Sequence, residues 1–174
     1  MDNGRCIINY SIKAVFEVQS RGEKVKLFPY TLSKYCKGLI IDGVEKYPST
    51  NYEFDEIGQH IVYYLVDLSS VSSLDELFGN NAYLISVAFT PLFGSSNVKS
   101  MEKMFQYCTN LISVDFSSID TSGVTSTYYM FLHDEKLTYV NMENLDFSSL
   151  KKAEYMFSYC HSLTSINIDL KKAT

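Results

Sequence analysis

Residues 104–131 read MFQYCTNLISVDFSSIDTSGVTSTYYMF, and residues 156–168 read MFSYCHSLTSINI. The Met-Phe pair that opens each stretch occurs three times at a spacing of 26 residues. Four further apolar positions keep this spacing, and an earlier, more divergent copy lies 27 residues before the first. Self-similarity at a fixed period of about 20–50 residues is typical of repeat proteins, whose copies stack and share one core. The second half of the chain is therefore predicted to form about four stacked coils.

Each copy has two parts with different hydrophobic patterns. In residues 98–108 the apolar positions lie three and four apart, which is typical of a short α-helix or 3₁₀-helix with one buried side. In residues 111–116 apolar and polar positions alternate, which predicts a short strand buried on one face. Turn residues follow, including Gly123. The strands of successive copies are expected to lie parallel, about 4.8 Å apart.

The two quoted stretches closely resemble the BspA-like leucine-rich repeat, which has the pattern MF-x-x-C-x-x-L-x-x-[LVI]-[DN]-[LIF] followed by turns rich in Ser, Asp and Thr. The resemblance covers roughly residues 69–169, with Asp134 and Asn81 at the Cys position of the third and first copies. It implies a solenoid of secreted and surface proteins in bacteria and some protist parasites, used for adhesion and protein–protein contact. It also implies an extracellular or cell-surface location and no shared catalytic site.

Residues 1–68 contain no such repeat. Residues 12–18 and 24–28 are predicted to form a hairpin, and residues 37–44 a third strand that turns at Asp42-Gly43. The stretch YEFDEIGQHIVYY, within residues 50–68, weakly resembles the corner of immunoglobulin-like or PKD-like β-sandwiches. The predicted fold class is α+β, with an N-terminal antiparallel β-sandwich-like cap (1–68) packed on a leucine-rich-repeat solenoid (69–174).

Charge and hydropathy exclude several classes of protein. The chain has 174 residues, and 15 Lys and Arg against 20 Asp and Glu give a net charge of −5, which argues against nucleic-acid binding through a basic face. No apolar stretch approaches the roughly 18–20 residues that span a bilayer. The first residues lack the pattern of a secretion signal. The last predicted strand ends near Ile168, and an unpaired strand edge tends to pair with other strands. We therefore expect one of three arrangements: end-to-end self-association through this uncapped coil, shielding of the edge by Lys171 and Lys172, or further repeats.

The residues that most often carry chemistry form no catalytic or metal-binding motif. Cys108 and Cys160 hold the same position two coils apart, roughly 10 Å, which is too far for a disulfide. The sequence leaves open whether Cys6 and Cys36 pair. None of the three histidines lies in a zinc-binding spacing, and neither a nucleophile elbow nor a glycine-rich phosphate loop is present. We therefore expect no cofactor, no metal and no catalytic residue.

What remains is the outward face of the predicted strands. The outward positions form a small polar plateau with one aromatic ring, made of Ser113, Asp115, Tyr139, Asn141, Ser165 and Asn167. Glu143 and Asp169 lie just beyond it. Regularly stacked strands present an extended binding surface, so the sequence predicts a non-catalytic module that binds a protein or glycan ligand there. Two alternatives are a structural spacer in a larger surface protein and a carbohydrate-active enzyme that uses Asp115 and Glu143 as paired carboxylates.

Overall fold

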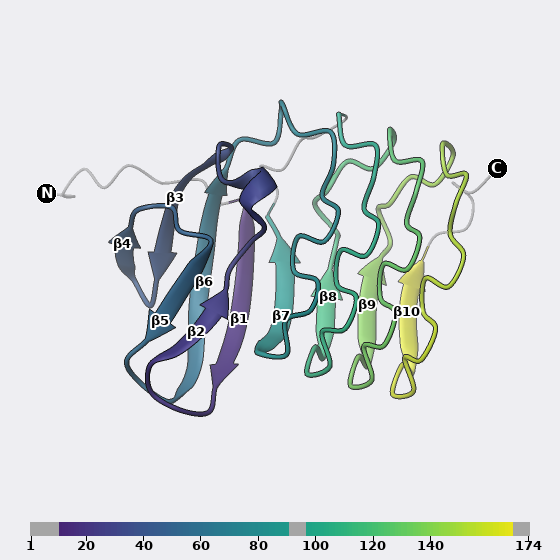
Figure 1. Ribbon diagram of the computed structural model, residues 1–174. Coiled ribbons are helices and arrows are strands. Elements are labelled where there is room, and N and C mark those ends of the chain that lie inside the picture. Colours follow the sequence, from purple (N-terminus) through teal and green to yellow (C-terminus); the bar gives the residue numbers. More distant parts are fainter. Residues whose placement is uncertain (1–10, 91–96, 169–174) are drawn as a thin grey trace, which may run out of the picture.

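The computed structural model describes residues 11–90 and 97–168. One eight-stranded sheet runs through the molecule in the order β10-β9-β8-β7-β1-β6-β3-β4, and a two-stranded ribbon, β2-β5, lies over its N-terminal half (Figure 1). The elements are β1 (Ile12–Val18), β2 (Glu23–Lys26), the 3₁₀-helix η1 (Tyr30–Leu32), β3 (Cys36–Ile41), β4 (Val44–Lys46), β5 (Asn51–Phe54), β6 (Gly58–Val66), β7 (Leu84–Phe89), β8 (Ser113–Asp115), β9 (Tyr139–Met142) and β10 (Ser165–Ile168).

Strand β1 joins the two halves of the sheet. It pairs antiparallel with β6 on one side and antiparallel with β7 on the other, and β7 to β10 then follow in parallel. The hairpin predicted between residues 12–18 and 24–28 is therefore wrong, because β2 pairs with β5 instead. The sandwich-like cap is wrong as well, since β1, β6, β3 and β4 share one sheet with the repeats. The predicted boundary at residue 68 falls between β6 and β7 and stays a prediction.

The repeats form four coils: coil 1 (71–90), coil 2 (98–123), coil 3 (124–149) and coil 4 (150–168). Each contributes one strand to the sheet and one irregular segment to an opposite layer (Figure 1). Parallel bridges join the irregular segments through Ser73, Ser100, Ser126 and Lys152. We call this opposite side the turn layer.

The predicted helices of the repeats do not form, so the α+β leucine-rich-repeat solenoid is wrong. Within the described residues η1 is the one helical element, and the fold is nearly all β. The reason lies in the backbone donors of the turn layer. The N–H groups of Glu76, Phe78 and Asn80 donate to carbonyl oxygens of coil 2, at 3.0, 2.9 and 2.7 Å, instead of to residues four positions earlier. In these repeats, apolar residues three and four positions apart therefore indicate buried turns and not a helix.

Two residues in every coil take left-handed backbone angles, which breaks any helical run. In coil 3 they are Tyr129 and His133, with φ of 58° and 63°. Between them the chain turns locally, since Leu132 N–H donates to Tyr129 O at 3.2 Å. The same geometry repeats in the other coils, so the 26-residue period of the sequence is a period of turns and strands.

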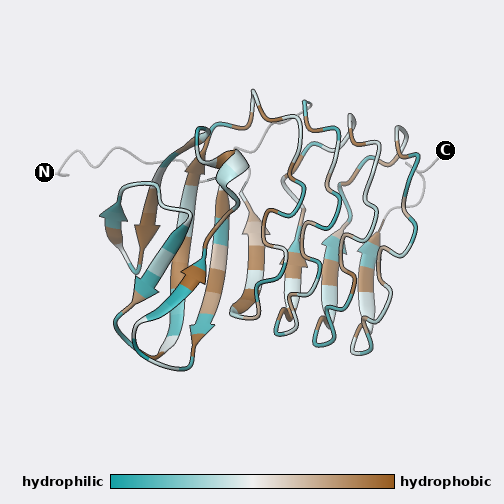
Figure 2. Ribbon diagram, in the orientation of Figure 1, coloured by the Kyte–Doolittle hydropathy of each residue, from teal (hydrophilic) through white to brown (hydrophobic). Residues whose placement is uncertain are grey.

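A continuous apolar core lies between the sheet and the turn layer. Figure 2 shows hydrophobic bands along the strands, matching the alternate burial of β1. Four phenylalanines of the turn layer stack one per coil at ring distances of 5.6, 5.2 and 5.2 Å: Phe78, Phe105, Phe131 and Phe157. Tyr64 of β6 packs edge-on against Phe78 at 5.9 Å and donates its hydroxyl to Leu27 O at 3.1 Å. The N-terminal strands therefore cover the first coil directly.

Candidate binding surface

The structure brings the six predicted binding residues together on the outward face of β8, β9 and β10. Asp115 pairs with Asn141, which pairs with Asn167, and Ser113, Tyr139 and Ser165 form the next row. Side chains directly across a strand pair point to the same face, so these two rows lie side by side on the sheet. Asp169 lies outside the described residues.

Hydrogen bonds between side chains hold the first row in place. Asn141 donates through Nδ2 to Asp115 Oδ1 at 3.0 Å, and Asn167 donates to Asn141 Oδ1 at 3.2 Å and to Glu143 Oε2 at 3.1 Å. Asp115 Oδ1 also accepts the N–H of Ser117 at 2.8 Å. Asp115 and Glu143 therefore accept hydrogen bonds from the asparagines of this row. These bonds hold the side chains of the row in one geometry.

A shallow hollow of about 270 Å³ opens beside this row. It is lined by residues of four adjacent strands, namely Lys13, Ser86, Val87, Ala88, Ser113, Val114, Asp115 and Tyr139. Lys13 of β1 lies directly across from Ala88 of β7, so the small side chain leaves space between the ammonium group and Asp115. Lys13 is the main residue that the sequence reasoning missed. The alternation of β1 marks it as outward-facing, but nothing local indicates that β1 neighbours β7.

The outward face continues onto the N-terminal strands and becomes apolar there. Tyr63 of β6 pairs with both Lys13 and Ile40, and Val15 pairs with Ile61. Ile61 is 37% exposed. One row of paired residues therefore crosses all eight strands, from Glu45 to Asn167, with Lys13 near the change from apolar to polar. Sequence reasoning also missed this apolar half.

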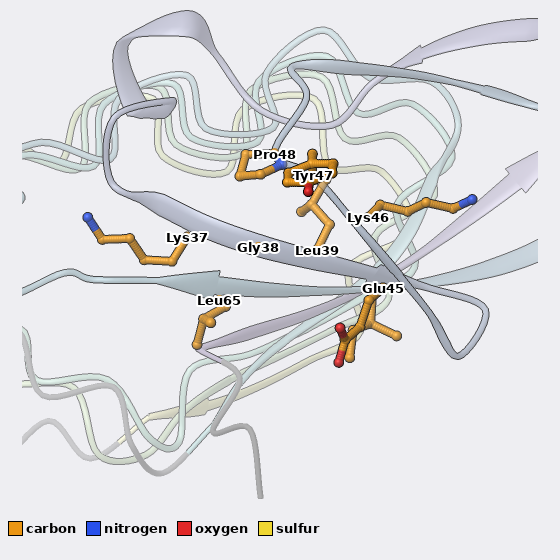
Figure 3. Close-up of a pocket in the computed structure, with 9 residues that line it drawn as sticks. Lys37, Gly38, Leu39, Glu45, Lys46, Tyr47, Pro48 and Leu65 are labelled. Carbon is orange, nitrogen blue, oxygen red and sulfur yellow. The ribbon is translucent and has the colours of Figure 1, made fainter. Parts of the chain in front are cut away.

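A larger hollow of about 410 Å³ lies beside the β3–β4 hairpin. Tyr47, Pro48 and Leu65 line it, and the aliphatic parts of Lys37 and Lys46 form its ends (Figure 3). Both ammonium groups point away from its centre in Figure 3. Ligand sites combine apolar walls with polar groups that converge on one point, and these lysines do not converge.

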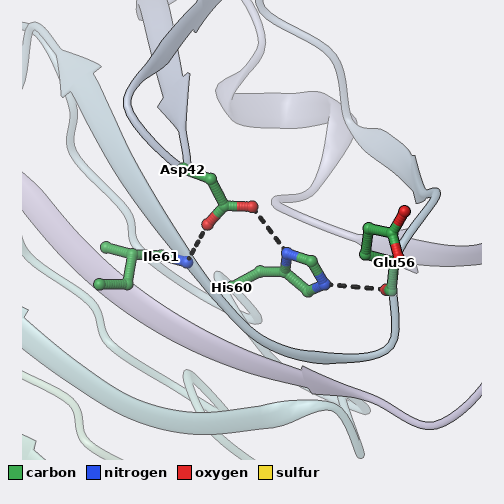
Figure 4. A network of polar contacts seen from close by, with 4 residues as sticks. All are labelled: Asp42, Glu56, His60 and Ile61. Atoms are coloured by element: carbon green, nitrogen blue, oxygen red, sulfur yellow. Dashed lines mark hydrogen bonds and ion pairs between the residues drawn. The ribbon is translucent and has the colours of Figure 1, made fainter.

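Each histidine is held by neighbouring side chains. His60 Nδ1 lies 2.7 Å from Asp42 Oδ2, and its Nε2 lies 3.0 Å from Glu56 O (Figure 4). Asp42 also accepts the N–H of Ile61 at 2.8 Å, so this network ties the β3–β4 turn to β6. In the turn layer, His133 stacks between two tyrosines of neighbouring coils, and His161 lies edge-on to Tyr159.

Cysteine and aspartate share one buried column of the coils. Cys108 Sγ donates to Phe78 O at 3.2 Å, and Cys160 Sγ donates to Phe131 O at 2.9 Å. Both are free thiols, as is Cys36, whereas Cys6 lies outside the described residues. Burial holds the pKa of Cys108 well above its usual range and raises that of Cys160 to about 12, so neither is a thiolate at neutral pH.

Asp134 occupies the same column between the two thiols. It is fully buried, and burial raises the pKa of its carboxyl to about 9. Its Oδ1 accepts the N–H of Cys108 at 2.8 Å, whereas Oδ2 has no hydrogen-bond partner. The carboxyl is therefore neutral at pH 7 and fills the slot that Asn81 fills in coil 1. Across residues 11–90 and 97–168, no group of three or more His, Cys, Asp or Glu side chains is arranged to hold a metal ion.

No helical segment in the described part of the chain has the length and hydrophobicity needed to cross a membrane. No curated protein and no solved structure matches the chain. The profile of one family does match, over residues 72–172, and that family is described as Mycoplasma protein of unknown function, DUF285. The match begins in coil 1 and covers all the later coils. Since it spans more than half of the 174 residues, the chain belongs to the DUF285 family.

Proposed function

We propose that the chain is a non-catalytic binding module that takes a protein or glycan ligand on the outward face of its sheet. One observation supports this most directly. The polar row from Asp115 to Asn167 is held in a fixed geometry by its own hydrogen bonds and borders a hollow walled by Lys13 and Tyr139. A preorganised, extended face with one cation and one partly exposed aromatic ring suits recognition of a large partner.

The proposal extends to location and role. The resemblance to BspA-like repeats supports an adhesion role at the cell surface or in the secreted state, with residues 1–68 covering the first coil and residues 69–174 forming the repeats. The wide, shallow hollow gives less support to a carbohydrate-active enzyme. Its lining includes Asp115 but not Glu143, and an acid that must hold a proton requires a more enclosed site.

The structural spacer remains a second candidate for a specific reason. Each side-chain amide of the row already donates to a neighbour in the same row, so the row has its main hydrogen bonds without a ligand. A spacer predicts that changes to this face leave every interaction of the parent protein unaltered.

A binding screen with matched variants tests the proposal. The chain is screened against matrix glycoproteins and glycans beside a face variant carrying Ser113→Arg, Asp115→Lys, Tyr139→Ala and Asn141→Lys. The control carries Glu135→Lys, Glu154→Lys and Tyr155→Ala on the turn layer, which gives the same change in net charge and removes one tyrosine ring. Melting temperatures establish that both variants fold.

The expected result is a ligand whose affinity the face variant lowers at least about tenfold, while the control binds as the parent does. Loss in the control alone would move the site to the turn layer. Absence of any ligand in the screen would favour the spacer.

A further inference from the structure

The hollow beside the polar row is lined by side chains with unused hydrogen-bonding groups. Its residues come from β1, β7, β8 and β9, which lie side by side in the sheet (Figure 1). Asp115 accepts the N–H of Ser117 and the amide of Asn141 through Oδ1, and its Oδ2 accepts no hydrogen bond from a described residue. Four further lining side chains make no hydrogen bond or ion pair with any described residue: Lys13, Ser86, Ser113 and Tyr139.

The pairing of the strands sets the two charges of the hollow apart. Lys13, Ala88 and Asp115 lie in one row across β1, β7 and β8. The Cα atoms of Lys13 and Asp115 are therefore two strand spacings apart, about 10 Å, and the two side chains form no ion pair. Between them lie the small side chains of Ala88, Ser86 and Ser113. The hollow thus has a floor of small residues, with an ammonium group on one side and a carboxylate on the other.

The charges select a ligand with a single negative group. Lys13 favours an anion, because a hydrogen bond between an ammonium and a charged acceptor is stronger than one between neutral groups. Asp115 on the opposite side repels further negative charge, as does the net charge of −5 on the chain. A densely sulfated or phosphorylated polymer therefore fits poorly, whereas a ligand with one carboxylate meets both conditions.

The hydroxyl groups favour a sugar over a protein side chain. The anchors of protein partners are mostly aromatic residues or arginine in desolvated pockets. An aromatic anchor would bury the hydroxyls of Ser86 and Ser113 without replacing their bonds to water, and an arginine would face Lys13. A sugar offers hydroxyl groups to the serines and to Asp115 Oδ2, and its C–H face can pack on the Tyr139 ring, which is 38% exposed.

We propose that the hollow binds a sugar that carries one carboxylate, with the carboxylate at Lys13 and the sugar hydroxyls at Ser86, Ser113 and Asp115. This assignment rests on the proposed binding function of the outward face and names its ligand class. The volume of about 270 Å³ lies just below the roughly 300–1,000 Å³ of small-molecule sites, so a short segment of a glycan fills it. Such a sugar can come from sialic acid at the end of a glycoprotein glycan or from a uronic acid within a matrix polysaccharide.

A titration of the full, isotope-labelled chain tests the assignment by nuclear magnetic resonance. The probes are sialyllactose and a hyaluronan tetrasaccharide, each beside its neutral counterpart, lactose and the carboxyl-reduced tetrasaccharide. The expected result is that one acidic oligosaccharide binds at least about tenfold more tightly than its neutral counterpart. The shifted amides should include Ser86, Ala88 and Ser113, which line the hollow. The probe that binds identifies the source of the sugar.

Two matched variants test the role of Lys13. Lys13→Gln removes the charge and keeps a polar side chain, so the acidic probe should bind about as weakly as its neutral counterpart. Lys24→Gln makes the same change in net charge on β2, outside the hollow, and should bind as the parent does. Melting temperatures establish that both variants fold.

Three outcomes would overturn the assignment. Equal binding of acidic and neutral probes, or equal losses in the two variants, would mean that Lys13 does not hold a carboxylate. Binding of neither acidic probe would exclude the ligand class. Loss of a protein ligand in Lys13→Gln, with neither oligosaccharide bound, would assign the hollow to an acidic side chain of a protein. In each case a ligand that the face variant loses in the binding screen would still support the proposed function, so the two proposals can fail separately.

Discussion

The two halves of the molecule meet the same backbone requirement with different residues. In the N-terminal half, the left-handed positions are Gly22, Gly43, Gly58 and Asp42, residue types that adopt this geometry readily. The coils have eight such positions and no glycine at any of them: Glu76, Asn80, Lys103, Tyr107, Tyr129, His133, Tyr155 and Tyr159. A left-handed non-glycine residue costs about 1–3 kcal/mol.

Repetition explains the difference. Each left-handed side chain of the coils has a counterpart at the same position one coil away, and where two counterparts are aromatic their rings pack together, as those of Tyr129 and Tyr155 do at 5.2 Å. His133 lies between Tyr107 at 4.9 Å and Tyr159 at 4.1 Å, and each aromatic contact contributes about 0.5–1.5 kcal/mol. A turn in the N-terminal half has no such counterpart, so a glycine there gives up no stacking contact.

The largest effect is expected where the coils are most regular. Phe105→Ala should lower the free energy of unfolding by about 3–5 kcal/mol, because its fully buried ring stacks on both Phe78 and Phe131. Phe157→Ala, at the same position of the last coil, should lose clearly less, since its ring is only half-buried and stacks on Phe131 alone among the described residues. Urea unfolding of both variants measures the difference. Equal losses would contradict the weaker burial of the Phe157 ring.

The next effect concerns the buried carboxyl of coil 3. The folded-state pKa of Asp134 is about 9, above the ordinary aspartate value of about 4. Between about pH 4 and pH 9 the carboxyl is therefore protonated in the folded chain and ionised in the unfolded chain. The contribution of Asp134 to stability is therefore fully present near pH 4 and is lost as the pH rises to about 9.

Asp134→Asn removes this titration and keeps the shape of the side chain. The variant should unfold at the same urea concentration as the parent near pH 4 and be more stable by about 2–4 kcal/mol at pH 7. By its place in the column, the new amide faces the Phe105 carbonyl, as Cys108 faces that of Phe78. A parent and variant with parallel pH profiles would show that the carboxyl is ionised in the folded chain.

A smaller effect tests whether the two halves unfold together. Asp42→Asn weakens the bonds to His60 and Ile61 while retaining a residue that tolerates a left-handed angle, so a loss of about 1–3 kcal/mol is expected. Because β1 pairs with both β6 and β7, hydrogen exchange in coil 2 should accelerate as much as exchange in β6. Arg21→Ala is the control, since its ion pair with Glu56 is 71% exposed on both sides and contributes below about 1 kcal/mol. Faster exchange confined to β6 would mean that the coils fold independently.

The same contrast explains how much could be predicted from sequence. In the coils, equivalent residues 26 apart indicate which positions stack, so Tyr139 and Asn141 were assigned correctly to one outward face with Ser113 and Asp115. The helices were wrong because a spacing of three and four fits a helix and a pair of tight turns equally well. Whether a backbone N–H donates within its coil or to the next coil is a property of the stack, which a single repeat does not encode.

In the N-terminal half no repetition constrains the pairing. The turn at Asp42-Gly43 was correct because the dipeptide itself favours a hairpin. The partners of β1 were not predicted, since β6 and β7 lie far along the chain and any alternating strand would satisfy the same pattern. Lys13 was missed for this reason, whereas Ser113, Asp115 and Tyr139, which line the same hollow, were placed on the outward face.

The smallest effect addresses the left-handed positions directly, with two substitutions that should act in opposite directions. Lys103→Gly relieves the strain of a left-handed residue and removes only an exposed ion pair, in which the ammonium lies 4.0 Å from Glu76. Glycine also adds entropy to the unfolded chain, so the free energy of unfolding should rise by no more than about 0.5 kcal/mol. His133→Gly relieves the same strain but removes two ring stacks, so a net loss of about 1 kcal/mol is expected. If both variants were more stable than the parent, the stacked columns would not offset the strain, and some cause other than stability would have to keep glycine out of the coils. Opposite signs would mean that a left-handed side chain stabilises a coil only where a neighbouring coil offers it a stacking partner, which an isolated turn does not have.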